Sequence, residues 1–224
     1  TDMGFEEPSP IQEQTIPLVL DGYDVIGQAQ TGTGKTAAFG IPLVQSITDH
    51  KHIQALIMSD RELAIQVAEE VGKIGRTSRI KALPVYGGQP IERQIRALKS
   101  GVQIVIGTPG RLIDHINRNT IKLDHIKFLV LDEADEMLDM GFVDDMEEIM
   151  RNLLLKADAA VFRNHAAPDS EPYQKYMKAP KNVTVSKEEL TVPLIEQYYL
   201  KPKQGRSYAV CLMLKLTASI YLFL

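Results

Sequence analysis

Short apolar runs alternate with longer amphipathic stretches along the first 155 residues of the chain. The apolar runs are rich in Val, Ile and Leu, which is typical of buried strands. They predict strands at Val25–Gly27, Gln54–Met58, Ile80–Tyr86, Gln103–Ile106 and Lys127–Leu131. The stretches between them predict helices at Lys35–Ile47, Arg61–Ile74, Ile91–Leu98, Arg111–Arg118 and Glu136–Leu155. This alternation predicts an α/β fold in which helices cover both faces of a mostly parallel β-sheet.

The alternation weakens after residue 158, where prolines interrupt it. Only weak strands are predicted beyond this point, at Val183–Val185 and Ile195–Leu200. The tail, residues 209–224, is apolar, but it is short and Lys215 interrupts it. A membrane-spanning helix needs about 20 apolar residues. The tail therefore predicts core elements of a further unit rather than a membrane anchor.

Residues 29–36 read AQTGTGKT, between a predicted strand and a predicted helix. This pattern is typical of a phosphate-binding loop, because small residues let backbone N–H groups close around phosphate oxygens at a helix N-terminus. Lys35 would neutralise the outer phosphates of a nucleoside triphosphate, and Thr36 would ligate Mg²⁺. A Gly/Thr turn without a ligand is the alternative. The residues predicted to contact the nucleotide here are Ala29, Gln30, Thr31, Gly32, Thr33, Gly34, Lys35 and Thr36.

An acidic string, Asp132-Glu133-Ala134-Asp135, directly follows the buried strand that ends at Leu131. A carboxylate at the end of a strand, downstream of a phosphate loop, is the expected second Mg²⁺ holder, and Asp132 fits that role. Glu133 is placed to orient and deprotonate a water molecule, as an ATPase requires. A small-molecule kinase does not need that base. A solvated helix start is the remaining alternative for the acidic string.

The formal net charge of −4 conceals three regions of different sign. Residues 1–75 carry a net charge of −7, and residues 128–150 hold nine acidic residues and no basic one. Residues 76–127 carry ten Lys or Arg and three Asp or Glu, a net charge of +7. A basic segment within an acidic protein is either a surface for a polyanion or a set of solvated helix faces.

The single cysteine, Cys211, excludes an intrachain disulfide and fits a reducing compartment. The first residues contain no positively charged stretch followed by an apolar one, so no signal peptide is predicted. We expect a cytoplasmic protein.

In order and spacing, these motifs resemble the first RecA-like domain of a DEAD-box RNA helicase. The acidic tetrapeptide at 132–135 is the one that names the family, and the resemblance covers about residues 4–200. It implies a RecA-like P-loop NTPase domain over residues 1–200. Residues 201–224 would then be the linker and the truncated start of a second RecA-like domain, which is otherwise absent from this chain. The arginines that complete the ATP site would come from that second domain.

Residues 4–12, GFEEPSPIQ, resemble the adenine-reading motif of the family. By this resemblance Phe5 would stack on adenine, and Gln12 would hydrogen-bond its edge, for which an amide has the right donor and acceptor. A helix N-terminus with Pro10 in its first turn is the other interpretation, and the two are compatible.

Three further segments resemble the family's RNA-backbone motifs. Each follows a predicted strand, and glycines and helix N-termini suit close contact with phosphates. The residues concerned are Arg61, Gly87, Gly88, Thr108, Pro109, Gly110 and Arg111. Two of the three segments lie in the +7 region, which favours the polyanion surface. Contacts to the RNA backbone carry no sequence specificity.

Two departures from the family limit the resemblance. Ser59-Asp60 stand where the family has Pro-Thr, and a negative charge at Asp60 is expected to weaken RNA binding. The Ser-Ala-Thr motif that would pair with Asp135 and couple the two domains is missing, and residues 159–165 stand in its place. Two functions remain open. The chain is the ATP- and RNA-binding domain of a helicase that couples ATP hydrolysis to RNA unwinding, nearly inactive alone, or it is a truncated, non-catalytic nucleotide- or RNA-binding module.

Overall fold

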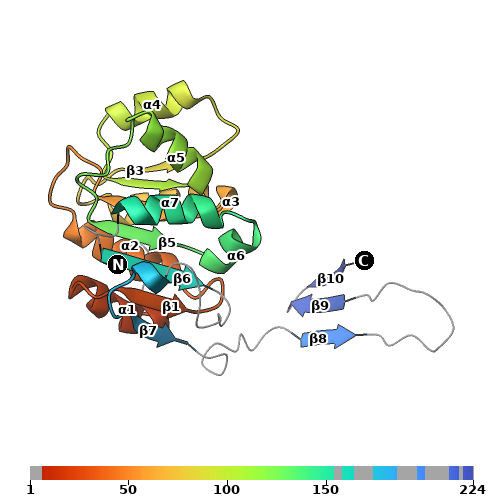
Figure 1. Ribbon diagram of the computed structural model, residues 1–224. Helices are drawn as coiled ribbons and strands as arrows, with labels where there is room; N and C mark the ends of the chain where they lie inside the picture. The colour runs from red at the N-terminus through yellow and green to blue at the C-terminus, as the bar shows by residue number, and fades with distance from the viewer. Residues whose placement is uncertain are drawn as a thin grey trace. The chain divides into compact units, whose positions relative to one another are not determined.

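The computed structural model has seven parallel strands in one sheet (Figure 1). It describes the backbone of residues 7–153, 158–163, 174–185, 196–199, 212–216 and 219–223, and the side chains of residues 7–153 and 174–185. The chain divides into two compact units, residues 1–185 and 186–224. The domain limits predicted at residues 200 and 201 stay a prediction.

All strands of the large sheet run parallel, in the order β3-β4-β2-β5-β6-β1-β7. Their bounds are β1 Val25–Gln28, β2 Ala55–Met58, β3 Ala82–Val85, β4 Ile104–Gly107, β5 Phe128–Leu131, β6 Asp158–Arg163 and β7 Lys181–Thr184. The five strands predicted before residue 132 are confirmed, with ends that differ from the prediction by at most one residue except at the start of β3, which begins two residues later than predicted. Because the strands are parallel, all their carboxyl ends meet at one edge of the sheet.

Helices cover both faces of this sheet, as predicted (Figure 1). Their bounds are α1 Pro10–Leu20, α2 Lys35–Ser46, α3 Arg61–Ile74, α4 Ile91–Lys99, α5 Pro109–Asn117, α6 Ala134–Asp139 and α7 Val143–Leu153, followed by the short 3-10 helix η1 Gln174–Tyr176. Leu56 and Met58 of β2 belong to the core beneath α4, α5, α6 and α7. Ala55 and Ile57 are equally buried and, because successive strand side chains alternate, they face the opposite layer.

The central strand β6 was not predicted. Its sequence begins Asp158-Ala159-Ala160, and Ala and Asp are poor strand formers on their own. Its position between β5 and β1 supplies the pairing that the local sequence does not signal, with Ala160 opposite Val130 and Val161 opposite Ile26. Long-range pairing therefore overrides local propensity here.

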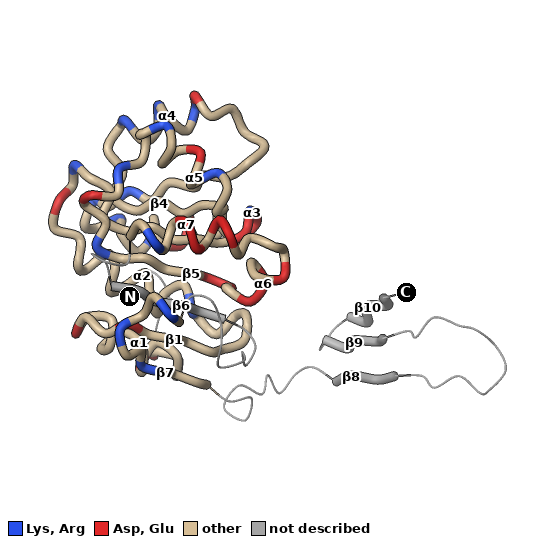
Figure 2. Tube along the Cα trace, viewed as in Figure 1, with Lys and Arg blue, Asp and Glu red and all other residues tan. Residues whose placement is uncertain are grey.

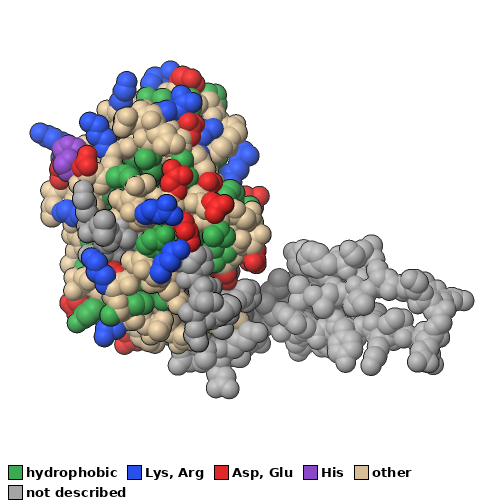
Figure 3. Space-filling model, viewed as in Figure 1, with side chains coloured by type: hydrophobic (Ala, Val, Ile, Leu, Met, Phe, Trp, Pro, Cys, Tyr) green, Lys and Arg blue, Asp and Glu red, His purple; other side chains and the backbone are tan. Residues whose placement is uncertain are grey.

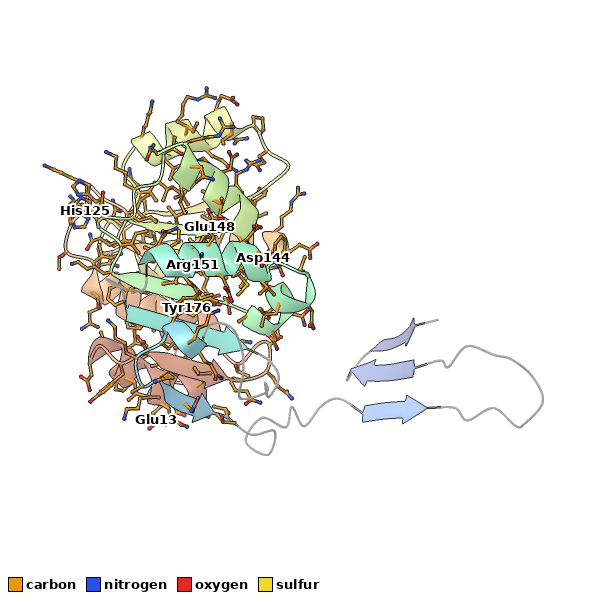
Figure 4. All side chains as sticks on the ribbon, in the orientation of Figure 1. Glu13, His125, Asp144, Glu148, Arg151 and Tyr176 are labelled. Carbon is orange, nitrogen blue, oxygen red and sulfur yellow. The ribbon has the colours of Figure 1, made fainter. Side chains whose placement is uncertain are left out.

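The single helix predicted at Glu136–Leu155 is wrong, because two helices, α6 and α7, occupy this stretch. Gly141 lies between them with φ of 83°, a left-handed conformation that ends a helix. The second helix is amphipathic: Asp144, Glu148 and Arg151 are exposed on its outer face (Figure 4). Its buried residues are Met146, Ile149, Met150 and Leu153.

The second unit is described by its backbone strands only. β8 (Glu196–Tyr199), β9 (Leu212–Leu216) and β10 (Ser219–Phe223) form an antiparallel sheet in the order β10-β9-β8. The weak strand predicted at Ile195–Leu200 is confirmed by β8, and β9 and β10 lie within the apolar tail of residues 209–224. Among the described residues, the search for a helix of membrane-spanning length and hydropathy finds none.

Gly141→Ala and Gly72→Ala form a matched pair that tests the break between α6 and α7. A methyl group added at either glycine meets no other atom within 4 Å, so the two substitutions differ in backbone conformation. Gly141→Ala should lower the free energy of unfolding by about 1–2 kcal/mol, the cost of a left-handed residue with a Cβ. Gly72→Ala, within α3, should raise it by about 0.5–1 kcal/mol. Urea unfolding measures both, and equal effects of the two would contradict the assigned break.

Candidate functional site

The carboxyl ends of five parallel strands bring the predicted motifs to one edge of the sheet. The phosphate loop follows β1 and the acidic tetrapeptide follows β5, with β6 between these strands. The three motifs that resemble RNA-backbone motifs follow β2, β4 and β3, which are neighbours in the same sheet. The strand order therefore separates a nucleotide region from an adjoining RNA region.

The phosphate loop has the shape that its sequence predicts. Gly32 and Gly34 have φ of 82° and 86°, values that a residue with a side chain rarely adopts. Thr33 Oγ1 donates to Gln30 O at 2.8 Å, which closes the loop on itself. Ala29, where the general phosphate-loop pattern has glycine, is 1% exposed, so only a small side chain fits. The helix α2 begins at Lys35 and presents its positive end to the loop.

A cavity of about 340 Å³ lies beside this loop. It brings together the lysine and hydroxyl predicted to contact phosphates and Mg²⁺ with the two acids predicted after β5. The residues that line it are Thr31, Gly32, Gly34, Lys35, Thr36, Leu63, Gln66, Val67, Glu70, Asp132 and Glu133. The two halves of the predicted nucleotide site, 97 residues apart in sequence, therefore meet in one place.

Buried opposite charges dominate the cavity. Burial lowers the pKa of Lys35, while Asp132, Glu133 and Asp135 act to raise it. Burial raises the pKa of Asp132 to about 7, and Lys35 opposes this shift. Oδ1 of Asp132 is buried and has no hydrogen-bond partner within the part of the chain that the structure describes. A buried carboxylate oxygen without a partner fits a divalent cation, whose preferred ligands are oxygens.

Glu133 adopts an unusual backbone conformation for a residue with a side chain. Its φ and ψ are 53° and 51°, in the left-handed region. Such a conformation costs of order 1–3 kcal/mol and is concentrated at functional sites. Here it turns the chain sharply from β5 into α6, and both Asp132 and Glu133 line the cavity.

Gln12 is bonded to the phosphate loop. Its Nε2 donates to Gly34 O at 3.2 Å, and its Oε1 accepts from Ser9 N at 3.0 Å, in the capping box of α1. The helix start at Pro10 is thus confirmed. Phe5 lies outside the described residues. The predicted contact of Gln12 with adenine stays a prediction, while its bond to Gly34 ties this motif to the loop.

The three motifs of the RNA region touch one another. The Arg61 guanidinium lies 5.5 Å from the centroid of the Tyr86 ring. A Cβ built on Gly88 would lie 3.1 Å from Arg61 Nη1, so a side chain at this position would crowd the arginine. Thr108 N donates to Val85 O at 3.2 Å, which joins the start of α5 to the end of β3.

Arg111 points into the protein rather than straight out to solvent. Its side chain is 16% exposed, and Nη1 donates to Gln89 O at 3.1 Å and to Gln94 Oε1 at 2.9 Å. Gln94 and His115 are buried partners that no sequence motif indicated. At the start of α5, a Cβ on Gly110 would lie 3.1 Å from Asp145 Oδ2, so an acid of α7 stands beside it.

Charge is divided between the two regions. Lys and Arg lie on and around α4 and α5, whereas Asp and Glu follow α6 and α7 (Figure 2). Figure 3 shows the same division on this face of the surface, with basic side chains gathered where α4 lies. Of the two interpretations of the +7 segment, the gathering of its residues at one end of the sheet favours a polyanion surface.

The helix α3 supplies a cavity wall that the sequence did not assign. Four residues of one face of α3 line the cavity: Leu63, Gln66, Val67 and Glu70. Their spacing of three and four residues is the feature of the sequence from which a shared helix face could have been predicted. Ile65 of the same helix is 37% exposed and is not part of this wall.

The structure gives a contact for one of the two departures from the family and leaves the other open. Asp60, expected beside RNA phosphate, caps α3, since its Oδ1 accepts from Leu63 N at 2.9 Å. Asp135 is half-buried near Lys35, but the side chains of residues 159–165, where its partner motif should stand, lie outside the described residues. The predicted coupling role of Asp135 therefore stays a prediction.

Known proteins share this fold and these motifs. The DEAD-box ATP-dependent RNA helicase CshA of Bacillus subtilis (strain 168) is 54% identical over 209 residues, which are 92% of this chain but 42% of that relative. The crystal structure of a DEAD box protein from the hyperthermophile Methanococcus jannaschii matches with a TM-score of 0.79 and 41% identity, over 88% of this chain and 53% of that one. The yeast DEAD-box splicing factor Prp28 matches with a TM-score of 0.77 and 31% identity, over 83% of this chain and 47% of that one.

These matches confirm the predicted RecA-like α/β fold, while this chain spans less than half the length of CshA. The sequence profile described as DEAD/DEAH box helicase matches residues 9–168. Because that match takes in both halves of the cavity and all three motifs of the RNA region, the chain belongs to the DEAD/DEAH box helicase family.

Proposed function

We propose that this chain is the ATP- and RNA-binding domain of an ATP-dependent RNA helicase, and that the full-length protein couples ATP hydrolysis to the unwinding of RNA duplexes. The observation that carries this proposal is the meeting of Lys35, Thr36, Asp132 and Glu133 in one cavity. The similarity to CshA, named as an ATP-dependent RNA helicase, supports it.

The phosphate loop and four side chains of the cavity have roles in this proposal. The loop amides and Lys35 bind the outer phosphates of ATP, and the Thr36 hydroxyl and Asp132 carboxylate hold Mg²⁺. When bound, Mg²⁺ neutralises the charge that develops on the transferred phosphoryl group. Glu133 orients a water molecule and accepts its proton as the water attacks the terminal phosphorus, and the bond to the leaving diphosphate oxygen breaks.

A second RecA-like domain is the partner that we propose for this site. Arginines supplied across a cleft to a phosphoryl-transfer site are worth about 10³–10⁵ in rate. Without such arginines the chain should bind ATP and hydrolyse it very slowly. We also propose that RNA lies across the ends of β2, β4 and β3 through contacts to its backbone, and that the protein acts in the cytoplasm, as its single cysteine favours.

A second candidate function is a non-catalytic nucleotide- or RNA-binding module. The missing Ser-Ala-Thr sequence at residues 159–165 favours it. Adding the second domain of a close relative in trans distinguishes the two candidates. RNA-stimulated ATP hydrolysis would support the helicase, and continued inactivity, with ATP and RNA both bound, would support the binding module.

Lys35→Ala should weaken the binding of ATP in the presence of Mg²⁺ by about 100-fold, because a hydrogen bond to a charged group is worth up to ~3 kcal/mol. Titration with a fluorescent ATP analogue measures the affinity. Lys51→Ala, an exposed lysine in the loop before β2, is the control and should leave the affinity unchanged. Equal affinities of the wild type and Lys35→Ala would refute the phosphate site.

Glu133→Gln should keep ATP affinity within about twofold and remove the remaining hydrolysis, because the amide keeps the shape of the side chain but cannot accept the proton. Phosphate release with the second domain of a relative in trans measures this. Glu136→Gln, three residues further along the chain, is the matched control and should retain hydrolysis, because Glu136 is exposed and does not line the cavity. Hydrolysis by Glu133→Gln at the wild-type rate would show that another group is the base.

A further inference from the structure

One buried glutamine joins the two segments that would meet RNA. Gln94, in α4, is 3% exposed. Its Nε2 donates to Tyr86 O at 2.9 Å, at the start of the Gly87–Gly88 turn. Its Oε1 accepts from Arg111 Nη1 at 2.9 Å and from His115 Nε2 at 3.0 Å, both on α5. These four residues, Tyr86, Gln94, Arg111 and His115, are called the Gln94 bridge below.

Only one orientation of the Gln94 amide satisfies its neighbours. A guanidinium has donors and no acceptor, so Arg111 requires the amide oxygen on its side. Reversing the amide would set its oxygen against the carbonyl of Tyr86 and its NH₂ against the donors of Arg111. The hydrogen bonds therefore fix the amide in one position, and with it the distance between the turn and the helix.

His115 completes the bridge as a neutral ring. Burial lowers the pKa of His115, and Arg111 lowers it further. Because Gln94 Oε1 can only accept, Nε2 of the neutral ring carries the hydrogen. Nδ1 lies 2.7 Å from Thr120 Oγ1, whose hydroxyl donates to His115 O at 3.0 Å. The oxygen and nitrogen of the Gln94 amide and Nε2 of His115 thus each have a partner of the opposite kind, as a rigid buried network requires.

We propose that Gln94 is a positioning residue for RNA binding: it holds the Gly87–Gly88 turn and the first turn of α5 at a fixed separation, so that both meet phosphates of one strand. This inference rests on the proposed RNA-binding function. Arg111 serves the same purpose from the other side, since its Nη1 also bonds Gln89 O in the loop after the turn.

Gln94→Met tests this role, because it keeps the approximate volume of the side chain and removes all three hydrogen bonds without changing the charge. Binding of a labelled single-stranded RNA to the full chain is measured over a series of salt concentrations. We expect affinity to fall about tenfold, which corresponds to about 1.4 kcal/mol. The slope of log affinity against log salt should become shallower by about 0.7, the value for one phosphate contact on a single strand.

Gln103→Met is the matched control. Gln103 is 2% exposed and also bridges two segments, since its Oε1 accepts from Lys81 N at 3.0 Å and its Nε2 donates to His50 O. It lies before β4, at the opposite edge of the sheet from the RNA region. The variant Gln103→Met should lower the melting temperature as much as Gln94→Met does. It should leave the RNA affinity and the salt slope unchanged.

The outcomes separate this inference from the function on which it rests. A wild-type chain that binds ATP but no RNA would refute RNA binding and the role of Gln94 together. RNA binding whose affinity and salt slope survive Gln94→Met would refute the role of Gln94 alone, as would equal losses in Gln94→Met and Gln103→Met. If Gln94→Met does not fold, Gln94→Ala replaces it, because the shorter side chain leaves space for water beside Tyr86 O and Arg111. The same measurements of RNA affinity and salt slope then test the role of Gln94.

Discussion

Two opposite charges buried at the carboxyl edge of the sheet, Lys35 and Asp132, are the constraint on which the site depends. They are 7% and 4% exposed, and an isolated charge so far from water costs several kcal/mol. Each charge lowers that cost for the other, but Asp132 keeps one buried oxygen without a partner in the described part of the chain. A ligand that brings phosphate oxygens to the lysine and a cation to the carboxylate satisfies both groups, which is the electrostatic argument for a triphosphate with Mg²⁺.

The strand order places the nucleotide cavity and the RNA region beside each other along the sheet. With β6 between β1 and β5, the phosphate loop and the acids stand about two strand spacings, roughly 10 Å, apart, which leaves room for phosphates. With β2 beside β5, α3 becomes the wall of the cavity. The same helix begins at Arg61, which packs on Tyr86 in the RNA region, while Gln66 and Glu70 face the cavity. One helix therefore has its first residue in the RNA region and its following turns in the cavity wall.

The sequence was sufficient for the features that have a local signal. Buried runs predicted the strands before residue 132, and the glycine pattern predicted the phosphate loop and its lysine. It was insufficient where the stabilising partner is distant in sequence. The strand β6 depends on its neighbours in the sheet, and the bond from Gln12 to Gly34 spans 22 residues. Gln94 has no motif because its partners are a backbone carbonyl and two side chains of another helix. The break at Gly141 did have a local signal, since a glycine within a helical pattern can mark the end of a helix, but the prediction placed one helix across it.

Asp60 departs from the family pattern, and its contacts in the structure differ from the contact expected from the sequence. In sequence it follows β2 and stands among residues that resemble an RNA motif, so its charge was assigned to the RNA surface. In the structure its carboxylate caps α3, and its charge acts on Asp132, whose pKa it helps to raise. Because β2 and β5 are neighbours, the residues that follow them are close whatever their separation in sequence. Asp60 therefore stabilises the helix that forms the cavity wall, and its charge makes a small contribution to the raised pKa of Asp132.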